Sequence, residues 1–310
     1  MKFLSLFLFF SVLQLFSQEV NYEISSTELK VHTIREGLND PNIVFVLNVS
    51  IYDDKYLYKI RKNPKKVNEY LNKIKIFKNL RELRIDGDEI NLSNFSEYLT
   101  NNSKIENIKI YRINIDKWNR FFYNLSQHEN LKYLTIGASK NVEITDEIIK
   151  LKALKSINLY NVEINNFSDN FFELNNLFSL ILNNTNLKTL PKYVSNINSL
   201  NKIEIINHPD FNFRDAFLVL SNFQNLSDLS LFSNRLNFIP EEIGLLKNLK
   251  IINLGKNNLK DLPLSITKLE KLESILLAYG NNTLENLSEE FTSSIRLKKS
   301  ERGNYVLNSQ

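Results

Sequence analysis

A short leucine pattern returns at a nearly fixed distance along most of this chain. Neighbouring copies lie 23 to 26 residues apart, and a weaker tenth copy begins at Val44, ahead of a longer insertion. Self-similarity at such a period is typical of a solenoid, in which each copy forms one coil and stacks on the next. The first apolar position of the nine clear copies falls at Leu80, Ile105, Leu131, Leu154, Leu177, Leu200, Leu226, Leu249 and Leu272.

Each copy changes its apolar spacing partway along. In the stretch LSDLSLFSNRLNFIP, which ends at Pro240, Leu229 and Leu231 are two residues apart, as on one face of a strand. After Pro240, Ile243 and Leu246 return at helical spacing. Proline is well suited to the start of such an arm because its φ is fixed. We therefore expect a short strand and a returning arm in each coil, with both apolar sets pointing inside.

An asparagine follows the strand in two copies, at Asn234 and Asn257. The chain must bend there, and its buried backbone groups need partners. An amide side chain both donates and accepts hydrogen bonds, so stacked asparagines would form a ladder. Other copies place different residues in this position, and we expect a continuous ladder only towards the C-terminus. Those residues are Asp88, Ile113, Ser139, Val162, Thr185 and His208.

The copies closely resemble the leucine-rich repeat family, whose pattern is L-x-x-L-x-L-x-x-N-x-L, over roughly residues 43–290. The resemblance implies an α/β repeat fold: a right-handed solenoid with a parallel β-sheet on the concave face and short helices or irregular arms on the convex face. One copy buries too little to fold alone, so the array needs caps. We expect an N-terminal helical cap at 18–42, about nine to ten repeats at 43–290, and a C-terminal cap and tail at 291–310 with a final strand near Tyr305.

The first residues, MKFLSLFLFFSVLQLFSQ, predict a signal peptide at 1–17 with cleavage after Ser17, the alternative being an uncleaved anchor. The chain has no cysteine, whereas animal and plant extracellular members of the family usually cap their arrays with paired cysteines. The chain therefore looks more like a bacterial exported protein, and the LFSQ ending resembles signal peptides of the Bacteroidota. A bacterial lipoprotein would need a cysteine at the cleavage site. We expect a periplasmic, cell-surface or secreted protein without a membrane span after cleavage.

No motif in the chain predicts catalysis. The three histidines, His32, His128 and His208, match no metal-ligand spacing, and His208 stands in the asparagine position of its copy. Without cysteine there is no thiol nucleophile, which excludes the leucine-rich repeat ubiquitin ligases. Neither a G-x-S-x-G elbow nor a glycine-rich phosphate loop is present. We interpret the acidic pairs Asp53–Asp54 and Asp86/Asp88 as turn caps, and predict no catalytic residue, no metal and no cofactor.

The chain is mildly basic, with a formal net charge of +4. Its densest basic cluster is RKNPKK at residues 61–66, which we interpret as solvated surface and not as a nucleic-acid site. Trp118 lies in a returning arm and is expected in the core.

Residues between the strand leucines point away from the core and, by the resemblance, cover the concave face. Aromatic residues and arginine are typical anchors of protein interfaces, although scattered surface aromatics are also common. We hypothesise a non-catalytic binding module for a protein, with a glycan as a second option. The alternatives are a structural or self-associating cell-envelope protein without a foreign ligand, and an accessory domain for an enzyme. The candidate contact residues are Arg84, Lys109, Tyr111, Arg112, Tyr133, Tyr160, Phe232 and Tyr279.

Overall fold

The structure is a computed structural model. It describes residues 30–87, 90, 95–100, 102–192 and 199–284, together with the backbone of two strands at 297–299 and 305–307. The predicted signal peptide at 1–17 lies outside the described residues. The chain divides into two compact units, Met1–Lys30 and Val31–Gln310, and all the described coils belong to the second. No helix within the described ranges is long and apolar enough to cross a membrane.

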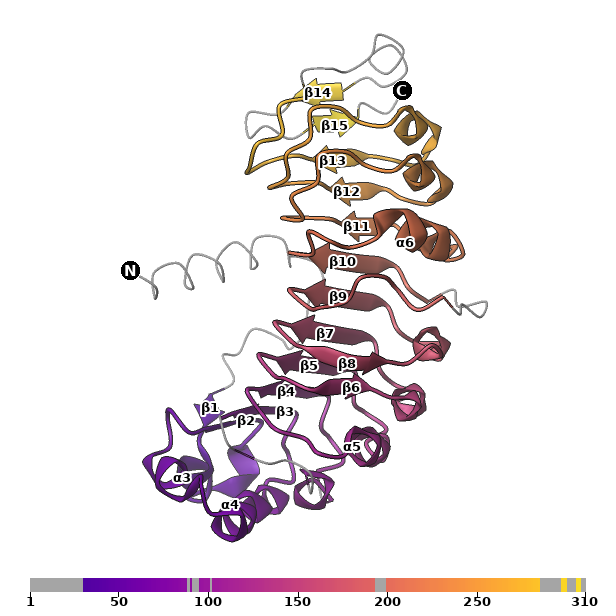
Figure 1. Cartoon of the computed structure of the whole chain (residues 1–310). Helices are drawn as coiled ribbons and strands as arrows, with labels where there is room; N and C mark the ends of the chain where they lie inside the picture. Colours follow the sequence, from indigo (N-terminus) through magenta and orange to yellow (C-terminus); the bar gives the residue numbers. More distant parts are fainter. Residues whose placement is uncertain are drawn as a thin grey trace. The chain divides into compact units, whose positions relative to one another are not determined.

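Stacked strands form one large sheet along the second unit (Figure 1). Thirteen strands pair in the described part of the chain, and eleven of them are parallel, following one another in chain order. These eleven are β1 (Val31–His32), β2 (Val46–Ser50), β3 (Glu82–Asp86), β4 (Asn107–Tyr111), β5 (Tyr133–Gly137), β7 (Ser156–Tyr160), β9 (Ser179–Asn183), β10 (Lys202–Ile206), β11 (Asp228–Ser230), β12 (Ile251–Asn253) and β13 (Ser274–Leu276).

The sheet ends in an antiparallel pair. The strand β15 (Tyr305–Leu307) pairs with β13, and β14 (Leu297–Lys299) pairs with β15. Thus β15 lies where the sequence predicted a final strand. A separate two-stranded parallel sheet joins β6 (Val142–Ile144) to β8 (Ile164–Phe167).

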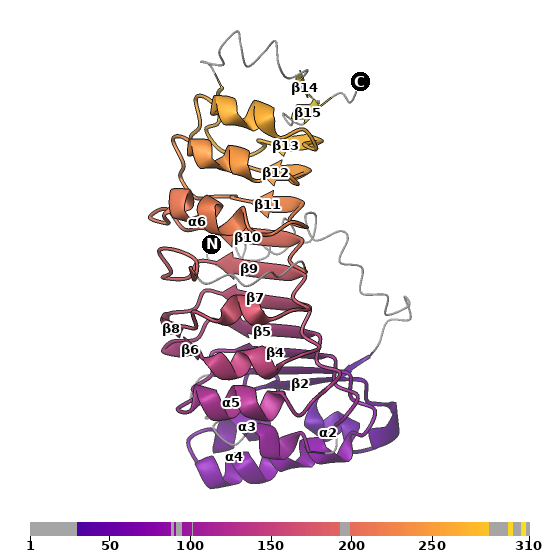
Figure 2. The same ribbon diagram turned by 90° about the vertical axis from the view of Figure 1, so that its right-hand side faces the viewer.

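The returning arms lie on the side of the coils away from the large sheet (Figure 2). They contain the helices α3 (Lys55–Ile60), α4 (Pro64–Leu71), α5 (Trp118–Leu125) and α6 (Phe213–Leu220), preceded at the N-terminal end by α2 (Ile34–Gly37). Shorter 3₁₀ turns are η1 (Pro41–Ile43), η2 (Asn72–Ile76), η3 (Phe95–Tyr98), η4 (Asp146–Lys150), η5 (Phe171–Glu173), η6 (Glu241–Leu245) and η7 (Leu264–Lys268).

The length of a coil decides the kind of arm it forms. The 26-residue coils that start at Ile105 and Leu200 contain α5 and α6, each of eight residues. The 23-residue coils that start at Leu226 and Leu249 contain the five-residue turns η6 and η7. Because an α-helix rises about 1.5 Å per residue and a 3₁₀ turn about 2.0 Å, the two arms span similar distances. Three extra residues are thus accommodated without disturbing the strands.

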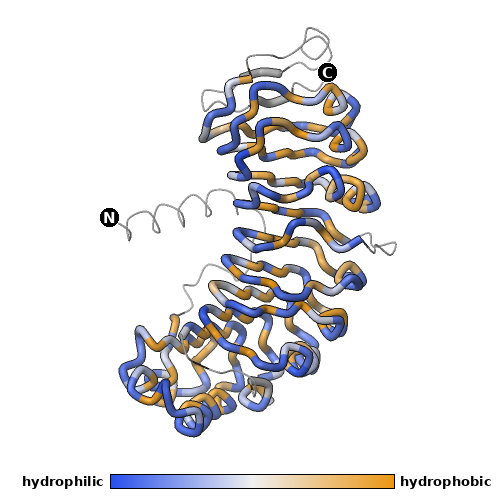
Figure 3. The backbone as a smooth tube through the Cα atoms, viewed as in Figure 1, coloured by the Kyte–Doolittle hydropathy of each residue, from blue (hydrophilic) through white to orange (hydrophobic). Residues whose placement is uncertain are grey.

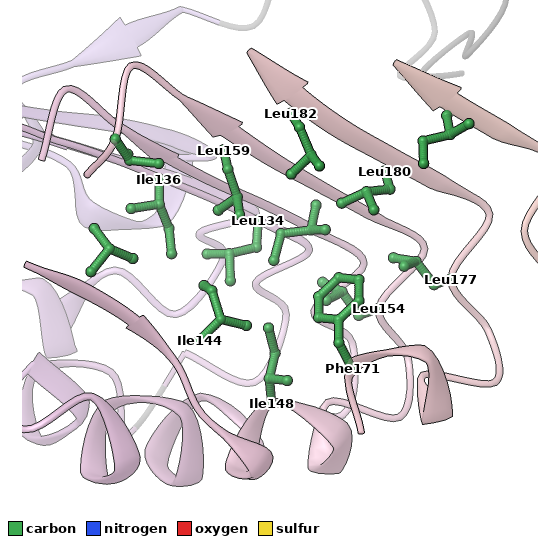
Figure 4. Packing of buried hydrophobic residues seen from close by; sticks show 14 of the residues in the cluster. Leu134, Ile136, Ile144, Ile148, Leu154, Leu159, Phe171, Leu177, Leu180 and Leu182 are labelled. Carbon is green, nitrogen blue, oxygen red and sulfur yellow. The ribbon is translucent and has the colours of Figure 1, made fainter. Parts of the chain in front are cut away.

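One continuous hydrophobic core runs between the sheet and the arms (Figure 4). Apolar residues recur at matching points of successive coils, as the hydropathy colouring shows (Figure 3). Leu226, Leu229 and Leu231 are all buried, which confirms the prediction that one apolar line runs through the coils. Trp118 is also in the core, as expected, and its ring nitrogen donates to the Asn141 carbonyl at 2.9 Å.

A ladder of buried and partly buried side chains closes the turns of the C-terminal coils, and we call it the turn ladder: Thr185, His208, Asn234, Asn257 and Asn282. The Asn257 side-chain oxygen accepts from the backbone N–H groups of Asn234 and Leu236 at 2.9 and 3.1 Å. Its amide nitrogen donates to three carbonyls, among them that of Leu231 at 2.9 Å. Asn234 repeats this one coil earlier, since its oxygen accepts from the backbone N–H of His208 at 2.7 Å. The sequence prediction of a ladder towards the C-terminus is confirmed.

Each parallel strand of the large sheet from β4 to β13 is followed by a bend whose residue has positive φ. Such backbone is uncommon for residues other than glycine, and asparagine tolerates it best. The bend residues have φ between 49° and 63°, and they are Arg112, Ala138, Asn161, Asn184, Asn207, Ser233, Lys256 and Tyr279. The same bend therefore recurs in coil after coil.

The N-terminal end differs from the helical cap expected at residues 18–42. In its described part, Val31 and His32 form β1, which pairs in parallel with Val46 and Leu47. Only a four-residue helix, α2, follows, with a capping box between Thr33 and Glu36. The edge of the sheet offers unpaired backbone groups to this segment, and strand pairing satisfies them.

Candidate binding face on the sheet

The sheet face is the surface formed by those strand side chains that point away from the core. Alternation along each strand and the parallel register place these side chains in three rows. The first row runs Glu82, Asn107, Tyr133, Ser156, Ser179, Lys202, Asp228, Ile251, Ser274, and the second Arg84, Lys109, Thr135, Asn158, Ile181, Glu204, Ser230, Asn253, Leu276. The third runs Asp86, Tyr111, Gly137, Tyr160, Asn183, Ile206. Phe232, Gly255 and Ala278 continue it just beyond the ends of the shorter strands β11, β12 and β13.

The predicted basic residues on β3 and β4 surround a buried glutamate. Glu82 accepts from Arg84 Nε at 2.5 Å and from Lys109 Nζ at 3.1 Å. Asn107 Nδ2 donates to its other oxygen at 2.7 Å. Burial by itself would raise the pKa of Glu82, but the charges of Lys109 and Arg84 outweigh it and hold that pKa below its usual range. Much of the positive charge expected at this end of the face is therefore neutralised within the chain.

Arg112, the third predicted basic residue, stands at the bend after β4 and has internal partners too. Its Nη2 donates to Asp86, and its guanidinium lies over the Tyr52 ring, 4.9 Å from the ring centroid. Asp86, interpreted as a turn cap, is therefore an ion-pair partner. Asp54 does cap a helix, since its carboxylate accepts from the backbone N–H groups of Tyr56 and Leu57 at the start of α3.

Tyr111 lies over the neighbouring strand and is less exposed than a freely projecting tyrosine. A Cβ atom at Gly137 would overlap the Tyr111 ring, so the glycine provides the space for it. Burial raises the pKa of the Tyr111 hydroxyl to about 12, with smaller effects of nearby charges. The ring therefore covers sheet backbone and offers only part of its surface to a partner.

Phe232 repeats this arrangement five coils later. A Cβ atom at Gly255 would lie 3.0 Å from the Phe232 ring, so the ring again rests over a glycine of the next coil. Tyr279 stands at the last bend and is 59% exposed. These two residues lie near the C-terminal end of the face, several strands away from Tyr111.

The middle of the sheet face has no charged side chain. We call this region the central band; it consists of the nine face residues of β5, β7 and β9: Tyr133, Thr135, Gly137, Ser156, Asn158, Tyr160, Ser179, Ile181 and Asn183. Asn158 lies at its centre, and its buried Oδ1 accepts no hydrogen bond from the described residues. Charged pairs flank the band, with Glu82 on one side and the Lys202–Glu204 pair at 2.8 Å on the other. The band therefore combines tyrosine rings with hydroxyl and amide groups.

The structure brings only some of the eight predicted contact residues together. Tyr133 and Tyr160 lie on the adjacent strands β5 and β7, within the central band. Arg84, Lys109 and Arg112 form the ion-paired end, while Phe232 and Tyr279 are remote from both. Sequence reasoning missed Glu82, although its spacing of two from Arg84 places both on one face of the strand.

The histidines do not form a metal site. No group of three His, Cys, Asp or Glu residues suited to a metal ion occurs among the described residues. His208 belongs to the turn ladder: its Nδ1 donates to the Ile206 carbonyl at 2.8 Å, and its Nε2 accepts from the Thr185 backbone N–H at 3.2 Å. Burial lowers the pKa of His208 to about 4 and also lowers that of His128. The structural role predicted for His208 is confirmed.

Comparison with solved structures identifies the fold. The chain is similar to TLR13 in its complex with ssRNA13, with a TM-score of 0.58 and 22% identity over 72% of this chain and 33% of that one. An internalin, InlF from Listeria monocytogenes, aligns at 20% identity over 72% of each chain with a TM-score of 0.42. No protein-family model and no curated protein sequence matches the chain. This chain spans about a third of the TLR13 chain. The fold is a right-handed leucine-rich repeat solenoid with a parallel sheet.

Proposed function

We propose that this protein is a non-catalytic binding module that recognises a protein partner through the central band of its sheet face. The composition of the band is the observation that supports this proposal most directly. Tyrosine with serine, asparagine and glycine is the set enriched in antibody binding loops. Tyrosine supplies a large contact area at low entropic cost, and the small polar residues adapt their hydrogen bonds to the partner. The band adds no net charge that a partner would have to neutralise.

The unpaired oxygen of Asn158 adds a second reason. A buried acceptor without a partner costs free energy, and rotation of the Asn158 side chain on binding would let a donor from the partner recover it. The oxygen lies between Tyr133 and Tyr160, in the row between theirs and on the same strand as Tyr160. A partner that covers the two rings would therefore also cover Asn158.

Export through residues 1–17 is part of the proposal, as is the bacterial exported type. It is supported by the apolar run after Lys2, by the small residue Ser17 and by the lack of cysteine in the chain. The intact mass of the protein recovered outside the cytoplasm tests it. A mass that begins at Gln18 agrees with export and cleavage, and a mass that still includes residues 1–17 contradicts cleavage.

The binding experiment compares two variants of similar chemistry. Tyr133→Ala with Tyr160→Ala removes the rings of the central band, whereas Tyr123→Ala removes a half-exposed ring from α5 on the arm side. Proteins captured by the wild type are identified, and one is purified for affinity measurement. We expect the band variant to lose at least about tenfold in affinity and the arm variant to lose less than about twofold.

Two outcomes would refute the proposal. Equal affinity of both variants would show that the partner does not use the central band. Turnover of a substrate by the purified protein alone would contradict the non-catalytic assignment. The melting temperatures of both variants should stay near that of the wild type, since none of the three rings belongs to the buried core.

A further inference from the structure

The longest insertion between two strands of the large sheet is also the most basic part of the molecule. Residues 53–79, between β2 and β3, contain nine Lys and Arg against three acidic residues, whereas the whole chain has a net charge of only +4. The rest of the chain is therefore slightly acidic. The insertion forms α3, α4 and η2, and successive elements contact one another. The positive charge of the protein is thus gathered at the N-terminal end of the solenoid, where α3 and α4 are drawn side by side (Figure 1).

The lysines of the insertion point into solvent. Seven of them are exposed: Lys55, Lys59, Lys62, Lys65, Lys66, Lys73 and Lys78. The apolar residues of the same helices, such as Leu57, Ile60 and Val67, are buried. Within the described residues, no salt bridge involves Lys55, Lys59, Lys65 or Lys66. This contrasts with the sheet face, where Arg84, Lys109 and Arg112 are all paired.

Tyrosine rings stand among these lysines. Tyr52, Tyr56 and Tyr58 are each more than half exposed, and Ile76 is 46% exposed. Internal contacts hold the three rings in place: Arg112 over Tyr52, Arg61 over Tyr58 at 3.9 Å, and Tyr70 against Tyr56 at 5.2 Å. Partly exposed tyrosines are typical of membrane interfaces, where one end of the side chain is in apolar surroundings and the other in water.

We propose that this surface, the basic insertion at residues 52–79, docks the protein on an anionic phospholipid surface. Eight of its nine basic residues are lysines, which are hydrated point charges suited to a diffuse layer of phosphate. Protein interfaces are depleted in lysine, and paired recognition of single phosphates favours arginine. Clusters of four to eight basic residues on amphipathic helices are typical of binding to anionic lipids. The proposal concerns a different surface from the central band and does not depend on it.

The test uses the full chain with vesicles of phosphatidylcholine, made with and without phosphatidylglycerol. Replacing Lys55, Lys59, Lys65 and Lys66 by Gln removes four charges from the insertion. The matched control replaces Lys140, Lys152, Lys155 and Lys260, which are exposed elsewhere, by Gln. Each lysine near an anionic surface changes affinity about fivefold. We therefore expect the insertion variant to lose at least about 50-fold in affinity for the vesicles with phosphatidylglycerol, and the control to lose less than about threefold.

The outcomes separate the proposal from simple charge attraction and from nucleic-acid binding. If the insertion variant and the control lose vesicle affinity equally, the proposed docking surface is wrong. The same follows if the wild type binds equally well to vesicles without phosphatidylglycerol. A single-stranded oligonucleotide that binds the insertion more tightly than the vesicles and displaces them would overturn the assignment to lipid. The variant Tyr56→Ser with Tyr58→Ser keeps the charge, and unchanged vesicle affinity for it would overturn the role of the rings. The band variant Tyr133→Ala with Tyr160→Ala should bind vesicles like the wild type.

Discussion

The coils before and after about residue 185 share one leucine core but close their turns differently. In the C-terminal coils, the turn ladder links one coil to the next through side chains such as Asn234 and Asn257. In the N-terminal coils, Ile113 and Val162 occupy the equivalent position and form no such bond. There the backbone pairs of β6 with β8 tie neighbouring coils together, and the Asn186 side chain binds both backbone groups of Ile164.

This difference separates two requirements of the repeat. The leucine positions must be apolar in every coil, because they fill the core between sheet and arms. The turn position only needs some source of hydrogen bonds for the buried backbone, which asparagine, histidine, threonine or a second strand can supply. The N-terminal coils should therefore tolerate changes at the turn that the C-terminal coils do not.

The largest effect is expected at Asn257. Replacing it by Ala leaves the N–H groups of Asn234 and Leu236 and the Leu231 carbonyl without their partner, inside the core. We expect a loss of about 3–5 kcal/mol in the free energy of unfolding, measured by urea denaturation at pH 7. The neighbouring variant Asn258→Ala removes an exposed bond to Asn281 and serves as the control. A loss below about 1 kcal/mol for Asn257→Ala would show that the C-terminal coils do not depend on the turn ladder more than the N-terminal coils do.

The next largest effect on stability is expected when the glycines under the aromatic rings, Gly255 and Gly137, are replaced by Ala. A Cβ atom at Gly255 would lie 2.5 Å from the Ala278 carbonyl oxygen, which is backbone and cannot move away easily. A Cβ atom at Gly137 would meet only the Tyr111 ring, which can turn towards solvent. We expect Gly255→Ala to cost about 2–3 kcal/mol and Gly137→Ala less than about 1 kcal/mol. Similar melting temperatures for the two variants would contradict this order.

The histidine in the turn ladder should make the C-terminal coils sensitive to acid. Its pKa of about 4 in the folded chain is below the ordinary value near 6.5, so the folded state favours neutral His208. This stabilising contribution is complete above about pH 6.5 and is lost as the pH falls through 4. Between pH 7 and pH 5, the wild type should lose about 1–2 kcal/mol more stability than His208→Asn, in urea denaturation series. Parallel pH profiles for the two proteins would show that His208 does not titrate in this way.

The smallest effect is expected in the N-terminal coils, at Ser139. Its hydroxyl donates to the Gly137 carbonyl at 2.9 Å and accepts from the Ile113 backbone N–H at 3.4 Å. Ser139→Ala should cost about 1 kcal/mol, well below the Asn257 variant. A cost equal to that of Asn257→Ala would mean that both halves depend equally on side chains at the turn.

The leucine period alone was enough to predict the stacked coils, the inward line of apolar residues and the C-terminal ladder. These features depend on local spacing, which every copy repeats. The partner of Arg84 and Lys109 was not predicted, because the Glu82–Lys109 ion pair joins two neighbouring coils, and the spacing within one copy does not determine it. The position of the Tyr111 ring over Gly137 depends on a side-chain rotamer and on the next coil, which spacing within one copy does not determine.

At two places the structure differs from the sequence pattern for similar reasons. Val31 falls within the helical cap expected at 18–42, but the open edge of the sheet pairs it with Val46. The pattern places the last ladder position at Gly280, whereas Asn282 binds the Leu254 and Leu277 carbonyls. In both places the neighbouring coil, and not the local pattern, decides the outcome.

The accommodation of three extra residues in the arms has a consequence for how such a protein diversifies. Since α5 and η6 span similar distances, an insertion on that side leaves the spacing of the face unchanged. The sheet face and the arms behind it can therefore change independently. Duplication or loss of a whole coil would lengthen or shorten the sheet face by one strand width, about 4.8 Å, without altering the residues already on it.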